Sequence, residues 1–127
     1  MTTASGFTNG ILSVKGKSLF RVGSVAVGDV GAGSGAVAVT GYFTSASKTS
    51  VGTGSANSTI TIVYPDLEFV PVILMSVLSL GTVGLDNDIL TPIVGSITST
   101  GCIVYLEETS QVTQNIDIKM ILVNEFI

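Results

Sequence analysis

Alternation of apolar and polar side chains dominates the second half of the chain. In residues 59–64, two isoleucines and Tyr64 fall on one side of an extended chain, while two threonines and Val63 fall on the other. Residues 115–120 alternate in the same way, with Ile116, Ile118 and Met120 on one face. A period of two residues predicts β-strands that bury one face.

Two segments are apolar on both faces. Residues 72–80 contain few polar side chains, and residues 120–123 contain none. Such a strand is typical of the centre of a packed sheet or of an oligomer interface. The sequence therefore predicts an interface on these strands, with Val72, Leu74, Val77, Ile121 and Val123 as its candidate residues.

Turn signals and further strand-like runs complete an all-β pattern. Thr100-Gly101 is a turn signal within a predicted hairpin over residues 94–107. Residues 18–27, 36–43 and 92–99 are further strand candidates, and no long helical period is present. The predicted fold is an antiparallel β-sandwich, such as a jelly roll.

The first half of the chain is rich in glycine and serine. Residues 28–35 and 44–58 consist largely of Gly, Ser, Ala and Thr. Such stretches form flexible loops or extended arms, and additional strands used in assembly are the alternative. Because ordering glycine is entropically costly, contacts with neighbours are expected here. We predict a compact sandwich over residues 59–127 and a Gly/Ser-rich assembly portion over residues 1–58.

Charge narrows the range of partners. Only 11% of the 127 residues are charged, against about a quarter in a typical soluble domain. In residues 1–58, four cations against one acid give +3, and in residues 59–127, one cation against eight acids gives −7. This asymmetry favours contact between opposite halves of two copies. The acidic total argues against nucleic-acid binding.

Two kinds of membrane signal are not found in the sequence. The most apolar stretch, residues 69–80, is too short to cross a membrane as a helix. Residues 1–6 lack the basic start and apolar core of a secretory signal. We therefore expect no membrane partner.

The residue types needed for common active sites are missing. The chain contains no histidine, which excludes Ser–His and Cys–His nucleophile pairs and histidine metal ligands. Adjacent Glu107 and Glu108 would point to opposite faces of a strand, whereas a glycosidase needs two carboxylates facing across a cleft. Cys102 has no disulfide partner and is expected to be a small buried side chain. We predict no enzyme activity and no cofactor.

Two groups of residues are candidate ligand contacts. Asp86 and Asp88 flank Asn87 and offer oxygens to a calcium ion, although a plain turn between strands is the favoured interpretation. Tyr42 and Tyr64 are candidate glycan contacts, but Tyr64 alternates with apolar residues as a core side chain does. The chain has no tryptophan, which is the commonest sugar platform.

The layout of the second half resembles a known family. It runs ITIVYP at residues 60–65, FVPVILMSV at 69–77, SITSTGCIV at 96–104 and IDIKMILV at 116–123. Over residues 59–124 this resembles the H-type lectin-like β-sandwich at the ends of many bacteriophage fibre proteins. The resemblance implies a six-stranded antiparallel sandwich, usually trimeric, mounted on a virion. The final strand lacks the family's frequent tryptophan, and no sugar-binding residues of the family have a match here.

The sequence therefore leads to one main hypothesis and two alternatives. The main hypothesis is a non-enzymatic virion structural protein, either a capsid decoration (cement) protein or a short fibre component. It assembles as a homotrimer and contacts other virion proteins such as the major capsid protein. One alternative is a carbohydrate-binding module that recognises a host-surface glycan, and the other is a small carboxylate hydrolase.

Overall fold

A computed structural model of the chain describes residues 6–8, 11–14, 17–31, 33–53, 55–79, 90–108 and 116–124. These contain eleven strands: β1 (Gly6–Thr8), β2 (Ile11–Val14), β3 (Lys17–Gly28), β4 (Gly35–Val37), β5 (Val39–Gly41), β6 (Ser45–Thr53), β7 (Ser55–Val63), β8 (Val72–Ser79), β9 (Leu90–Gly95), β10 (Gly101–Glu108) and β11 (Ile116–Val123).

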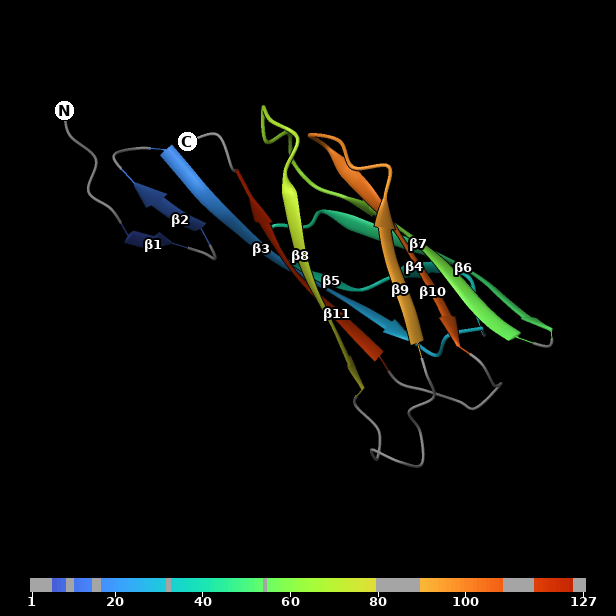
Figure 1. The fold of residues 1–127 in the computed structure, drawn as a ribbon. Coiled ribbons are helices and arrows are strands. Elements are labelled where there is room, and N and C mark those ends of the chain that lie inside the picture. The colour runs from blue at the N-terminus through green and yellow to red at the C-terminus, as the bar shows by residue number, and fades with distance from the viewer. Residues whose placement is uncertain are drawn as a thin grey trace.

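The strands form two antiparallel sheets packed face to face (Figure 1). Sheet A has the order β1-β2-β3-β11-β8, and β5 also pairs with β3. Sheet B has the order β4-β6-β7-β10-β9. The predicted all-β antiparallel sandwich is therefore confirmed. It contains eleven strands in the described residues, in place of the six that the family resemblance implies.

Both halves of the chain contribute to both sheets. In sheet A, β11 from the end of the chain lies between β3 and β8. The stretch 44–58 lies mostly in β6 and the start of β7, which pair along their whole lengths from Ser45↔Val63 to Thr53↔Ser55. The predicted boundary between residues 58 and 59 falls inside β7, so the two portions share one sandwich. A role of residues 1–58 in assembly stays a prediction.

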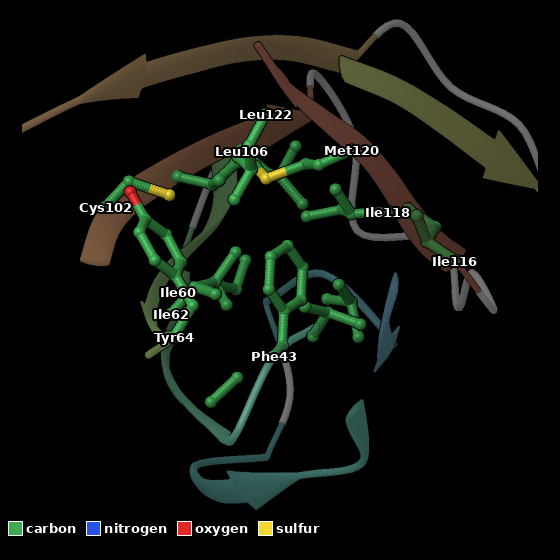
Figure 2. Packing of buried hydrophobic residues seen from close by; sticks show 14 of the residues in the cluster. Phe43, Ile60, Ile62, Tyr64, Cys102, Leu106, Ile116, Ile118, Met120 and Leu122 are labelled. Atoms are coloured by element: carbon green, nitrogen blue, oxygen red, sulfur yellow. The ribbon is translucent and has the colours of Figure 1, made fainter. Parts of the chain in front are cut away.

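The core lies between the sheets and is built largely from the period-two positions of β3, β7, β10 and β11. Sheet B contributes Ile60 and Ile62 of β7 and Val104 and Leu106 of β10, while β11 of sheet A contributes every second residue. Figure 2 shows the Phe43 ring reaching into the space between the labelled side chains of β7 and β11. The buried positions of β11 are Ile116, Ile118, Met120 and Leu122.

Two polar side chains are also buried at one end of this core. Lys48 of β6 is 8% exposed, and its Nζ donates to the carbonyl oxygens of Val27 at 2.8 Å and Asp29 at 3.1 Å. Ser58 of β7 accepts from the Gly31 amide at 3.2 Å and shares a hydrogen bond with Ser50. Because buried polar groups are costly unless they are hydrogen-bonded, these contacts fix the turn after β3 against sheet B.

The Phe43 ring packs directly over a glycine of β3. A β-carbon added at Gly23 would lie 2.7 Å from three atoms of the Phe43 ring, which is closer than carbon atoms can approach. Phe43 is 5% exposed and stacks on Tyr64 with ring centroids 6.0 Å apart. Gly23 therefore makes the space that this aromatic cluster occupies.

Gly23→Ala is expected to destabilise the protein by about 1–3 kcal/mol, because the ring must shift within a packed core. The matched control is Gly95→Ala in β9, where an added β-carbon meets no atom within 4 Å. Urea denaturation of both variants checks this. Equal midpoints for the two variants would contradict the packing described here.

Candidate functional site

One face of sheet A is turned away from the core. Its three long strands lie side by side, with β11 paired to β3 on one edge and to β8 on the other. Because Val25, Ile118 and Met75 point to the core, alternate residues must point outward. The outer face of sheet A therefore carries Phe20, Val22, Ser24 and Ala26 of β3, Asp117, Lys119, Ile121 and Val123 of β11, and Val72, Leu74, Ser76 and Leu78 of β8.

Apolar side chains gather at one end of this face. In one row, Ile121 lies opposite Val22 on one side and Leu74 on the other. In the adjacent row, Val123 lies between Phe20 and Val72 in the same way. We call these six residues the apolar patch. Leu74 is 57% exposed, Val72 39% and Ile121 36%.

The apolar patch is hollowed beside β11. A groove of about 340 Å³ opens there, and the residues that line it are Val22, Leu74, Met75, Ser76, Lys119, Met120 and Ile121. The lining is almost entirely apolar. Such a groove suits an apolar side chain better than a charged or strongly polar ligand.

Charges occupy the other end of the outer face. Lys119 lies between Ser24 and Ser76, and its Nζ is 3.4 Å from the Ser24 Oγ. Asp117 lies in the next row, between Ala26 and Leu78. Since they are two residues apart on one strand, the two charged side chains start about 7 Å apart. The face thus carries one cation and one anion next to its apolar patch.

The outer face of sheet B has a different character. Neighbouring strands β6 and β7 pair Ser47 with Thr61 and Thr49 with Thr59, which places these hydroxyls side by side. Thr61, Ser47 and Thr49 are exposed. The exposed apolar residues of this face, Val51, Val63 and Ile93, are separated by these hydroxyls, whereas the six residues of the apolar patch on sheet A adjoin one another.

Four of the five predicted interface residues lie together on the outer face of sheet A. They are Val72, Leu74, Ile121 and Val123. Val77 does not join them, because it pairs with Ile118 and packs against the core. Since β8 presents its even-numbered residues outward, Val77 lies on the opposite side of the strand from the other candidates. That the other four residues form an interface stays a prediction.

The outer face of β8 is not covered by the described residues of the chain. In this two-layer sandwich the same holds for the outer face of its neighbour β11, where Ile121 is exposed. The two-sided apolar character of β8 therefore has no explanation in the packing of the described residues of a single chain.

The two candidate glycan contacts occupy different environments. Tyr64 is 2% exposed and donates from its hydroxyl to the carbonyl oxygens of Thr98 at 2.8 Å and Gly101 at 3.0 Å. Burial raises the pKa of its hydroxyl well above 10.0. The structure therefore makes Tyr64 a core residue, and its ring offers no face to a sugar.

Tyr42 is half-buried beside Tyr64. Its hydroxyl donates to the Pro65 carbonyl at 2.9 Å, and the Arg21 guanidinium lies 5.0 Å from its ring centroid. This cation–π contact occupies one face of the ring. The Nε of Arg21 is buried and has no hydrogen-bond partner among the described residues. Sequence reasoning missed this contact, because Arg21 and Tyr42 lie on different strands and no local pattern joins them.

The described residues hold no cluster of side chains that fits a metal ion. No group of three or more Cys, Asp or Glu side chains converges among them. Asp86 and Asp88 lie outside the described residues. Glu107 is exposed and accepts from the Tyr105 hydroxyl at 3.3 Å. Cys102 is buried as predicted, and burial raises the pKa of its thiol to about 11, so it is a poor nucleophile at neutral pH.

Among the described residues, no helix is long and apolar enough to span a membrane.

Comparison with known proteins gives a likeness of fold. No family model matches the chain, and no curated protein matches it. Among solved structures, the chain is similar to an N-truncated R1-type pyocin tail fiber, with a TM-score of 0.57 and 20% sequence identity. The match covers 98% of this chain and 85% of that chain. The β-sandwich is thus one that a tail fiber protein also adopts.

Proposed function

We propose that this protein is a non-enzymatic structural component of a fibre on a phage or phage-tail-like particle. The observation that carries the proposal is the shared fold with the pyocin tail fiber over 98% of this chain. A match of this extent includes both sheets rather than a single hairpin motif. The family resemblance of residues 59–124 to phage fibre sandwiches points in the same direction.

The fibre role includes assembly into a homo-oligomer, which we expect to be a trimer. The support is the apolar patch on sheet A, since its residues adjoin one another over three strands and Leu74, Val72 and Ile121 are exposed, and a contiguous exposed patch of this kind marks an interaction site. The low charge of the chain, at 11% of residues, also suits a protein that is packed against neighbours.

A fibre role is favoured over the other roles considered. The similar solved structure is a tail fiber, which favours a fibre over a capsid decoration protein held by the major capsid protein. Glycan recognition has less support, because Tyr64 is buried and Tyr42 is stacked against Arg21.

Gene context and particle labelling test the proposal together. The gene is expected to lie among tail genes, and an antibody against the purified protein is expected to label tail fibres in electron micrographs. A gene beside the major capsid gene, with label spread over the head, would support decoration instead. Label on neither part of the particle would overturn the virion role.

A further inference from the structure

We propose that the outer face of sheet A binds a second copy of this chain, with Lys119 of one copy beside Asp117 of the next. This inference rests on the proposed assembly and assigns the surface that makes it. The apolar patch forms the centre of the contact, and the groove beside Ile121 receives an apolar side chain of the other copy.

The first argument is the contrast between the two sheets. Eight of the twelve outward positions on the three long strands of sheet A are apolar, and they extend over neighbouring strands in register. Homo-oligomer interfaces have a comparable apolar share, about 65% of their area. The outer face of sheet B also exposes Val51, Val63 and Ile93, but a block of threonine and serine hydroxyls lies between them. A contiguous apolar patch such as that on sheet A marks an interaction site, whereas single exposed apolar residues do not.

The second argument comes from charge. A patch that binds a differently charged protein usually carries one sign, and this face carries one of each. Lys119 and Asp117 are adjacent outward positions of β11, so the face is neutral and complementary to itself. Within the described residues, Lys119 contacts the Ser24 hydroxyl rather than an acid. Another copy provides the opposite charge for each of them.

The third argument is the edge of the sheet. Strand β8 ends sheet A and has no charged residue or proline over its eight residues. Proteins normally protect exposed edge strands with such residues. Among the other strands that end a sheet, β1 and β4 are only three residues long, and β9 has Pro92 within it. Leu74 of the apolar patch belongs to β8 itself, so the long unprotected strand and the patch adjoin each other.

The first test places a charge in the patch. Leu74→Asp is expected to weaken self-association at least about 30-fold, since residues at an interface centre contribute most of its affinity. The matched control is Ile93→Asp, which charges a similarly exposed residue, 56% against 57%, on sheet B. Sedimentation velocity over a concentration series measures both, and circular dichroism checks that each variant is folded.

The second test exchanges the two charges. Lys119→Asp alone and Asp117→Lys alone each leave two like charges on the face, so each variant is expected to associate more weakly. Carrying both substitutions in one chain restores opposite signs and is expected to restore association. High salt should reduce all of these differences.

The outcomes separate this inference from the proposed function. A wild-type protein that is monomeric would overturn both self-assembly and the interface. A wild-type oligomer that persists in Leu74→Asp, or that dissociates in Ile93→Asp, would overturn this interface and leave the fibre proposal standing. If the double variant did not associate again, the proposed contact between Lys119 of one copy and Asp117 of the next would be wrong.

Discussion

Ile118→Ala is expected to lower the free energy of unfolding by about 2–5 kcal/mol, the usual cost of emptying a packed core site. Ile118 is 0% exposed, and its strand β11 pairs with β3 on one edge and β8 on the other. Neighbouring strands hold the backbone on both edges, so the cavity cannot easily collapse. The value is therefore expected in the upper part of that range.

The matched control is Ile93→Ala, the same change at a residue that is 56% exposed on edge strand β9. It is expected to change the stability by less than about 0.5 kcal/mol. Urea denaturation at one fixed protein concentration compares the two, because self-association adds to apparent stability. If both variants lost the same stability, the assignment of the core to the inner face of β11 would be wrong.

Tyr64→Ala is expected to cost about 3–5 kcal/mol, as for other buried aromatic residues. Its ring is 2% exposed and packs between Phe43 and Tyr42. Its hydroxyl also holds the turn before β10 through the carbonyls of Thr98 and Gly101. Tyr64 therefore links the end of β7 to that turn.

Tyr64→Phe separates the hydroxyl from the ring. It is expected to cost about 1–1.5 kcal/mol, because the Thr98 carbonyl loses the hydrogen bond from Tyr64. The Gly101 carbonyl loses less, since it still accepts hydrogen bonds from the amide and the hydroxyl of Thr98. Tyr105→Phe is the control, since the Tyr105 hydroxyl bonds to Glu107 at the surface. An equal loss in the two variants would contradict the structural role of Tyr64.

The same hydroxyl gives the wild-type protein a dependence on alkaline pH. The pKa of Tyr64 is raised by folding, so the contribution of its neutral form is complete below pH 10 and is lost as the pH rises towards the folded pKa. Wild-type stability is therefore expected to fall more steeply above pH 10 than that of Tyr64→Phe. Identical slopes would show that the hydroxyl is not buried.

The second half of the fold could be predicted from the sequence because its strands alternate clearly. Residues 116–123 form one strand whose burial follows the predicted alternation, and the turn at Thr100-Gly101 leads directly into β10. The period of two determines which side chains are buried once one face of a sheet is packed. It therefore also placed four of the five candidate interface residues on a common face.

The strands of the first half could not be predicted in the same way, because they are stabilised by pairing with other strands rather than favoured by their own composition. Residues 45–53 have a loop-like composition but form β6, which gains its order from β7 along its entire length. Lys48 is buried there because the carbonyls of Val27 and Asp29 accept its protons. These partners come from the turn after β3, and no local pattern indicates such a contact.

The sequence also did not indicate that β8 lies at the end of sheet A. An apolar strand that is uncovered on one face looks the same in sequence as a central strand, since both have apolar residues at every position. Only the sheet order shows that β8 is at an edge.

Sedimentation velocity of the wild-type protein at micromolar concentration tests the central claim most directly. The account predicts a folded homotrimer as the main species, because the apolar patch on sheet A is covered by other copies of the chain. A folded monomer as the only species under the same conditions would contradict it.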